Sequence, residues 1–265
     1  RKADDIREKL KKNFSKLYDR LVLNLEKSFA KQIRIILLSQ GNALKKALQS
    51  INEKKDDEDT DQEDQSNTLT EKIFIITLVL FSTKYYMKRL LPLLLQSGKT
   101  GIEFFNTIEG LTDKDKVKYE DVEKDFTNWI KNYSETQIEY INNTTKKQVQ
   151  RIIKNGLANG DNYDKIAGDL FKHIDNIANS RSRTIAMTEV HNAVSKINFL
   201  SAAYKGMKNK TWNTCEDYRV RPAHVSLDGI TIPIAEEFLP GLSYPGDPNA
   251  PPSLTVLCRC WLTYS

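Results

Sequence analysis

The prolines of this 265-residue chain are confined almost entirely to its last quarter. Proline removes a backbone donor and clashes with the preceding helical turn, so a segment that lacks it is free to form long helices. Only Pro92 precedes Gly206, and the other seven prolines lie at positions 222, 233, 240, 245, 248, 251 and 252. This distribution predicts an α+β fold, in which a mainly α-helical N-terminal body is followed by a small C-terminal α+β cap with long ordered loops.

The N-terminal body shows apolar residues at helical spacing. The first stripe has steps of three or four residues, which is the repeat of one helix face. It consists of Ile6, Leu10, Phe14, Leu17, Leu21, Leu25 and Phe29. We expect a helix over 4–50, ended or bent at Gly41, and a second over 70–95, kinked or ended at Pro92. Further helices are expected over 113–142, 146–155 (capped by Asn143-Thr144-Thr145), from Asn162 or Asp164, and from Ser180 to Lys205.

Within the cap, three short runs are rich in β-prone residues and are bounded by turn residues. They cover 210–213, 229–234 and 256–263. Asp228-Gly229 is a tight-turn signal between two of them. Gly206 is expected to stop the last helix, so the small sheet should occupy 206–265.

An acidic, polar stretch separates the first two predicted helices. Residues 56–64 contain seven acids and no Lys or Arg. A segment of this composition buries too little apolar surface to offset the entropy of ordering it, so 53–68 is predicted to be a disordered acidic loop. We therefore divide the chain into an extended helical region, 1–120, and a second domain, 121–265, made of helices over 121–205 and the sheet.

Positive charge is concentrated in the first 55 residues. They carry 15 Lys+Arg against 6 Asp+Glu, or +9, whereas the whole chain is +5. Lys9, Lys11, Lys12, Lys16 and Arg20 are candidates for contact with nucleic acid or an acidic protein surface. A solvated helix face explains the same pattern. The longest apolar run, Ile73–Phe81, is far shorter than the ~20 residues needed to span a bilayer.

The three cysteines allow several chemical states. An odd, small number in a chain of this size argues against a disulfide framework and fits a reducing compartment. Cys215, Cys258 and Cys260 together with His224 would make a tetrahedral zinc site of three sulfurs and one nitrogen. Buried free thiols and a Cys–Cys bond are the alternatives. His173 and His191 have no ligand partner at matching spacing, and we assign them no chemistry.

An ordered series of short motifs fills the last 85 residues. It runs from Arg181-Ser-Arg-Thr-Ile-Ala-Met-Thr188-Glu189 through Trp212-Asn-Thr-Cys215-Glu-Asp217 and Arg219-Val-Arg221-Pro-Ala-His224 to Leu227-Asp228-Gly229 and Cys258-Arg259-Cys260. This series resembles the phage Mu F-like minor head proteins, the phage head morphogenesis family. The resemblance covers roughly residues 130–265, so 121–265 is interpreted as the Mu F-like domain. Ser182 and Met187 depart from the usual Ala and Arg of the family, and His224 stands where relatives often have the second Cys of a Cys-x-x-Cys. The motif residues are Arg181, Thr188, Glu189, Trp212, Asp217, Arg221, His224, Asp228 and Gly229.

These motif residues are expected to be structural. Arg181 and Glu189 could bracket an internal polar network on one helix, or Glu189 could accept hydrogen bonds from the loops that follow. Arg219, Arg221 and Arg259 are expected to pair with Glu189, Asp217 and Asp228, because the guanidinium fork suits carboxylates. We expect no catalytic residue.

The resemblance implies a structural minor capsid protein of a tailed phage or prophage. Such a protein would be found in the virion, in the capsid interior or neck, and in the host cytoplasm during assembly. Its partners would be the portal protein, other capsid proteins and double-stranded DNA, and its role head assembly or genome delivery. Two other classes stay open: an enzyme (a nuclease or transferase-type toxin) that uses Glu189, His224 and Arg221, and a zinc-stabilised DNA-binding module.

Overall fold

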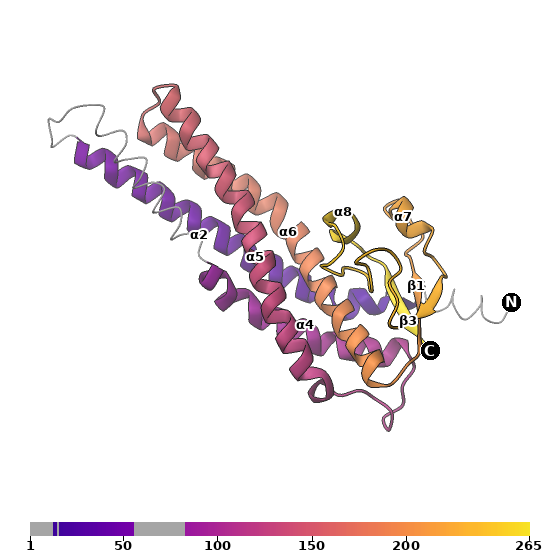
Figure 1. Ribbon diagram of the computed structural model, residues 1–265. Helices are drawn as coiled ribbons and strands as arrows, with labels where there is room; N and C mark the ends of the chain where they lie inside the picture. Colours follow the sequence, from indigo (N-terminus) through magenta and orange to yellow (C-terminus); the bar gives the residue numbers. More distant parts are fainter. Residues whose placement is uncertain (1–12, 15, 56–82) are drawn as a thin grey trace. The chain divides into compact units, whose positions relative to one another are not determined.

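A computed structural model of the chain describes residues 13–14, 16–55 and 83–265. These residues include four long helices: α2 (Leu23–Lys55), α4 (Thr83–Ile108), α5 (Tyr119–Ala158) and α6 (Tyr163–Tyr204). Short elements follow α6 and alternate with loops (Figure 1). The predicted fold class, a mainly helical body followed by a small α+β cap, is confirmed.

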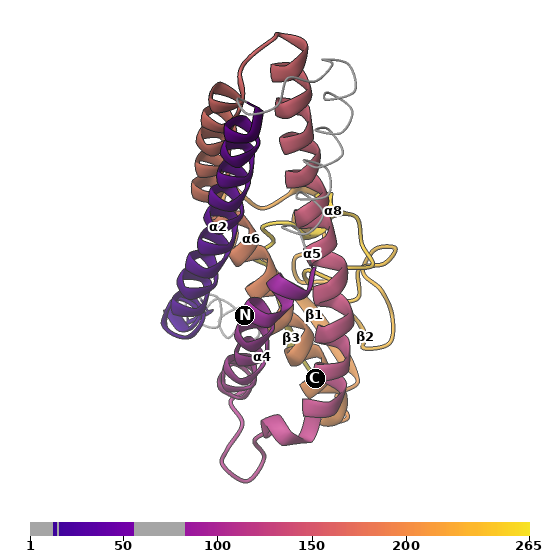
Figure 2. The same cartoon turned by 90° about the vertical axis from the view of Figure 1, so that its left-hand side faces the viewer.

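The cap contains a three-stranded antiparallel sheet of order β2-β1-β3. Its strands are β1 (Asn209–Asn213), β2 (Thr231–Pro233) and β3 (Trp261–Tyr264), and two one-turn helices, α7 (Pro222–Val225) and α8 (Pro252–Thr255), lie between them in the sequence. Thr211 of β1 faces Thr231 on one side and Thr263 on the other. All three predicted β regions are confirmed, although 256–260 forms a loop. In Figures 1 and 2 the loops after β1 lie beside the C-terminal half of α6.

Two compact units divide the chain. The first takes residues from 1–30, 91–133 and 183–265, and the second from 31–90 and 134–182. Each of the four long helices therefore contributes to both units. The division at 120/121 that the sequence suggested stays a prediction.

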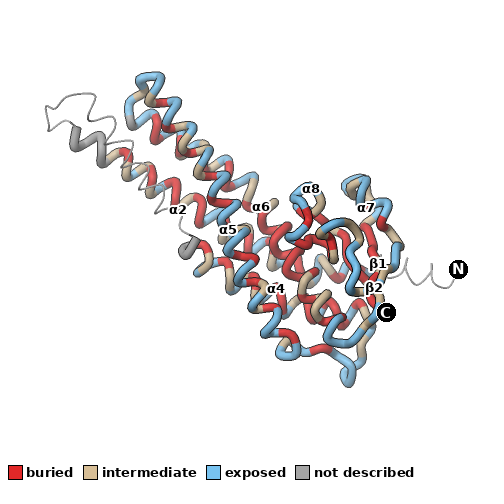
Figure 3. The backbone as a smooth tube through the Cα atoms, in the orientation of Figure 1, coloured by how far each residue is buried: buried red, intermediate tan, exposed pale blue. Residues whose placement is uncertain are grey.

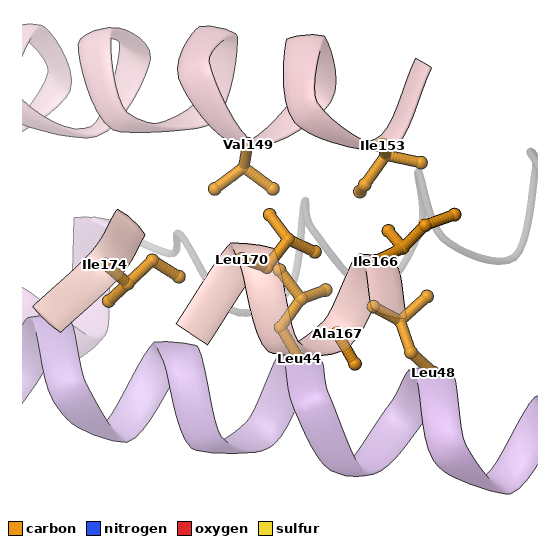
Figure 4. Close-up of a cluster of buried hydrophobic side chains, with 8 residues drawn as sticks. All are labelled: Leu44, Leu48, Val149, Ile153, Ile166, Ala167, Leu170 and Ile174. Carbon is orange, nitrogen blue, oxygen red and sulfur yellow. The ribbon is translucent and has the colours of Figure 1, made fainter. Parts of the chain in front are cut away.

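The second unit is built around aliphatic side chains from α2, α5 and α6. Figure 4 shows Leu44 and Leu48 facing Leu170 and its neighbours. Gly41 lies inside α2 and does not end it. The missing side chain lets α6 approach closely, since a Cβ on Gly41 would lie 2.9 Å from Cγ2 of Ile174. The complete cluster is Leu44, Leu48, Val149, Ile153, Ile166, Ala167, Leu170 and Ile174.

The first unit joins aromatic residues from the start of the chain, α4 and β3. Phe14 stacks on Trp261 with ring centroids 4.6 Å apart and meets Phe104 edge to face at 5.2 Å. Residues 188–195 of α6 are all buried, as the red segment of that helix shows (Figure 3). A helix buried on every side is central to its unit, and its polar side chains need internal partners.

Several predicted helix breaks are wrong. α4 continues through Pro92, Gly98 and Gly101 to Ile108, beyond the expected helix end at residue 95. A Cβ on Gly98 would lie 2.3 Å from Cε1 of Phe126, and one on Gly101 would lie 2.2 Å from Cγ2 of Ile197. Both glycines are therefore sites of close packing against α5 and α6.

Polar residues taken as helix starts also lie inside helices. α5 begins at Tyr119, six residues after the expected start, and runs through the predicted cap at 143–145. The Thr145 hydroxyl donates to the Ile141 carbonyl one turn back, and the Ser180 hydroxyl donates likewise to Asn176. Such back-bonding lets these residues sit within a helix. The start near Asn162 is confirmed, since its Oδ1 accepts from the Lys165 amide.

Some sequence predictions fall outside the described residues. These are the helical segments 4–12 and 70–82, the apolar run 73–81, and most of the acidic loop. α2 extends to Lys55, so the first three residues of the predicted loop, 53–55, are helical instead. Within the described ranges, no helix is long and apolar enough to cross a membrane.

The same Gly→Ala substitution should have opposite effects at a closely packed helical glycine and at one with open space around it. Gly101→Ala should destabilise the fold by about 1–3 kcal/mol, because the new methyl group overlaps Ile197. Gly168→Ala should stabilise it by about 0.5–1 kcal/mol, because Gly168 lies within α6 and its missing Cβ would meet no described atom within 4 Å. Urea unfolding of both variants checks the signs. A neutral Gly101→Ala would contradict the close contact.

A buried carboxyl links the end of α4 to β3 and should make stability depend on pH. The Glu109 Oε1 atom accepts a hydrogen bond from the Tyr264 amide at 3.2 Å. Burial raises the pKa of Glu109 to about 7, and the hydrogen bond from Tyr264 offsets this in part. The folded state therefore holds a proton that the unfolded state, with a pKa near 4.5, has already lost. This contribution is complete below pH ~4.5 and is lost as the pH rises to ~7.

Glu109→Gln should remove that loss, because the amide keeps the acceptor and cannot ionise. Relative to wild type, the unfolding free energy of Glu109→Gln should rise by about 1–3 kcal/mol as the pH is raised from 5 to 7.5. Glu103→Gln, at an exposed position of α4, is the control and should show no such gain. Parallel pH profiles for wild type and Glu109→Gln would count against the buried carboxyl.

Candidate metal centre

Three buried side chains of the cap bring nitrogen and sulfur together. Nδ1 of His224 lies 3.7 Å from Sγ of Cys258 and 3.4 Å from Sγ of Cys260. The ligand atoms of all three residues lie within 4.8 Å of one another. His224 belongs to α7, and the two cysteines immediately precede β3. The structure thus unites three of the four residues predicted as metal ligands.

Local backbone geometry directs these side chains inward. Arg221 is extended and Pro222 occupies the first turn of α7, a position where the missing N–H costs nothing. The His224 ring then meets Trp212 of β1 edge to face, with centroids 5.1 Å apart. In the segment before β3, Leu257 has a positive φ of 56°. This conformation costs a non-glycine residue about 1–3 kcal/mol, so other contacts must hold it.

The motif residues hold the cysteine segment from three sides. The Thr188 hydroxyl of α6 accepts a hydrogen bond from the Leu257 amide at 3.1 Å. Arg221 donates from Nη2 to the Val256 carbonyl. The Asp217 carboxylate pairs with the guanidinium of Arg259 at 2.5 Å. Each of these contacts fixes a residue that flanks Cys258 or lies between the two cysteines.

Cys215 is not the fourth member of the cluster in the described chain. Its Sγ donates to the Arg259 carbonyl at 3.1 Å, so it supports the segment from outside. Burial raises the pKa of its thiol. Cys215 was predicted as a ligand from its residue type, because the chain has few cysteines. Residue type does not show whether a side chain reaches the other ligands.

The two clustered thiols differ in their proton affinity. The pKa of Cys258 is lowered well below its usual value, mainly by a hydrogen bond from Cys260 and further by the His191 and His224 side chains. The pKa of Cys260 is raised by donating that bond and by burial. Cys258 is therefore the favoured thiolate of the pair.

His191 was assigned no chemistry from the sequence, yet the structure places it next to this cluster. It is buried on α6, three residues after Thr188, and positions three apart share a helix face. Its Nε2 lies 3.4 Å from the Ser195 hydroxyl. No partner among the described residues hydrogen bonds with its Nδ1. The signal was available in the sequence only as the i, i+3 spacing from Thr188.

Glu189 belongs to a separate buried network. Its Oε2 accepts from the Tyr133 hydroxyl of α5 at 2.6 Å, and the Tyr133 oxygen accepts from Nδ2 of Asn192 at 2.9 Å. Burial raises the pKa of Glu189 to about 7, against the opposing effect of the Tyr133 hydrogen bond. The expected bracket of Arg181 and Glu189 is wrong, because Arg181 donates to Thr145 at 3.2 Å instead.

The other polar predictions have mixed outcomes. Asp228 accepts from both the amide and the hydroxyl of Thr214, and Gly229 has a φ of 82°, so the predicted tight turn is confirmed. Arg219 lies 3.4 Å from Asp217, as the ion-pair prediction required. Arg221 was expected to pair with a carboxylate, but it donates to the backbone carbonyl of Val256.

The N-terminal basic candidates are only partly described. Lys16 and Arg20 are exposed on the helical segment 16–21. Lys9, Lys11 and Lys12 lie outside the described residues. The two that are described therefore remain available as surface contacts.

The segment that carries the site is similar to a family of phage head morphogenesis proteins. Residues 147–263 match the family described as "Phage Mu protein F like protein", which confirms the resemblance seen in the motifs. The chain is 33% identical over 144 residues to the "Uncharacterized protein YqbB" of Bacillus subtilis (strain 168), an alignment covering 51% of this chain and 47% of that protein. The chain thus spans about half the length of this curated relative. No solved structure matches.

The hydrogen bond to Leu257 predicts a measurable role for Thr188. Thr188→Val keeps the shape but removes the acceptor of the Leu257 amide from a part-buried hydrogen bond, which should cost about 0.5–1.5 kcal/mol. Thr144→Val is the control, because it removes only an exposed bond within α5. Urea unfolding compares the two. Equal stability of both variants would mean that the Thr188 hydroxyl does not hold this segment.

Proposed function

We propose that this chain is a structural minor capsid protein of a tailed phage or prophage that acts with the portal in head assembly or genome delivery. The observation that carries the proposal is the family match over 147–263, which contains nearly the whole cap and every motif residue discussed above. Thr188, Arg221 and Asp217 hold the cysteine segment. Motif residues that stabilise the fold in this way suit a structural protein, which acts by binding other proteins through its surface.

The partners would be the portal protein, other capsid proteins and packaged double-stranded DNA. Residues 1–55 carry a net charge of +9, and Lys16 and Arg20 are exposed within them. Positive side chains of this kind attract phosphates or an acidic protein surface. The protein would act in the virion, in the capsid interior or neck, after assembly in the host cytoplasm.

We further propose that the motif residues are structural and that the chain is not an enzyme. Glu189, His224 and Arg221, the candidates for a catalytic set, have different partners. Glu189 bonds with Tyr133, His224 faces the cysteines, and Arg221 bonds with Val256. A general base must lie within hydrogen-bond reach of the group that it activates, and these contacts engage all three residues in holding the fold.

Co-expression with a portal protein of the same phage or prophage tests the role. We expect a stoichiometric complex on size exclusion and incorporation into heads. Lys16→Glu with Arg20→Glu should weaken the complex or its DNA contact at least about tenfold, since each change reverses a charge that would face phosphate or acidic side chains. Lys131→Glu with Lys154→Glu is the matched control, because it makes the same change in net charge at exposed positions of α5. Glu189→Gln, which keeps the acceptor for Tyr133, should still support head assembly.

The outcomes separate the classes of protein. Salt-insensitive portal binding without a DNA mobility shift would remove DNA from the partners, because phosphate contacts weaken steeply with salt. A monomer that shifts DNA and ignores the portal would indicate an independent DNA-binding module. Turnover of a nucleic acid or a transferase substrate that Glu189→Gln abolishes at unchanged Tm would establish an enzyme.

A further inference from the structure

The nitrogen and sulfur cluster of the cap has no part in the proposed head function. His224, Cys258 and Cys260 are all buried. The separations of 3.4 and 3.7 Å between the His224 nitrogen and the two sulfurs bracket the value of about 3.5 Å that tetrahedral zinc requires, with Zn–S of ~2.3 Å and Zn–N of ~2.0–2.1 Å. The side chains thus already have the spacing of ligands to one ion.

A fourth donor comes from α6. His191 is buried on α6, and its side chain lowers the pKa of Cys258. Its ring nitrogens lie outside the group of ligand atoms that are all within 4.8 Å of one another, so the ring must turn to reach the ion. No described residue hydrogen bonds with its Nδ1. A buried polar atom without a partner is costly, and a metal ion would satisfy it.

We propose that His224, Cys258 and Cys260 bind one zinc ion and that His191 supplies the fourth ligand. Two thiolates and two imidazoles in a tetrahedral arrangement favour zinc over magnesium or calcium, which prefer oxygen. Four protein ligands leave no open position for water or substrate, so the ion is structural. It joins α6 to α7 and to the segment before β3.

This ion accounts for contacts around the cysteines. Leu257 adopts its unfavourable φ immediately before Cys258, and Thr188, one turn before His191 on α6, binds its amide. The same helix face thus holds the backbone and supplies a ligand. Cys215 bonds with the Arg259 carbonyl between the two ligand cysteines, which is a supporting contact.

The first test measures metal on the purified full chain, prepared under reducing conditions without chelator. Elemental analysis should find one zinc per chain in wild type, and none in Cys258→Ser or Cys260→Ser. Cys215→Ser is the matched control and should retain the zinc. Absence of zinc from wild type, with apoprotein that fails to take up added Zn²⁺, overturns the proposal. A thiol count after unfolding then distinguishes three packed thiols from a Cys258–Cys260 bond.

A second test avoids dependence on the folding of the cysteine variants. Wild-type apoprotein titrated with Co²⁺ should show tetrahedral ligand-field bands and a sulfur-to-cobalt charge-transfer band at one equivalent, and Zn²⁺ should displace them. Octahedral bands, or a charge-transfer band that Cys215→Ser removes, overturn the assigned ligand set.

The fourth ligand has its own comparison. His191→Gln should lower zinc affinity by more than the roughly 10- to 100-fold loss typical of changing a residue that only orients a ligand, and it should alter the Co²⁺ bands. His173→Gln, a helical histidine of the other unit, should change neither. Unchanged affinity and spectrum in His191→Gln would remove His191 from the site.

Discussion

One stretch of α6, residues 188–195, is buried on every side, and it contains five polar side chains. Each must find a partner inside the protein, because bulk water does not reach it. Thr188 binds the Leu257 amide, Glu189 and Asn192 share Tyr133, and His191 meets the Ser195 hydroxyl. The cap loops and α5 are therefore fixed in position by the polar atoms of a single helix.

Much of the fold follows from simple sequence rules. Proline placement separates helices from cap, and apolar spacing predicts the helices that the structure describes. The same rules fail at Gly98, Gly101 and Ser180, where a residue that often ends a helix lies within one. At the two glycines the cause is tertiary, since Phe126 and Ile197 need the space that a side chain would fill. Local propensity carries no information about a neighbour far along the chain.

The site was predictable only in part. His224, Cys258 and Cys260 were chosen as ligands on residue type, and their convergence agrees with that choice. Cys215 was chosen on the same ground and lies against a carbonyl instead. His191 and Tyr133 were not found, because each acts through a partner that the fold alone brings near. Residue type proposes a ligand, and only the path of the chain decides which candidates meet.

The interleaving of the two units limits how this chain can be divided. The family match begins at residue 147, yet the unit that contains the cap also uses Phe14, Phe104 and Tyr133. In a fragment restricted to the matched segment, Trp261 would lose its stacking partner and Glu189 its hydrogen-bond donor. The matched segment thus lacks side chains that fill the interior of its own unit, and the earlier segments 13–30 and 91–133 supply them.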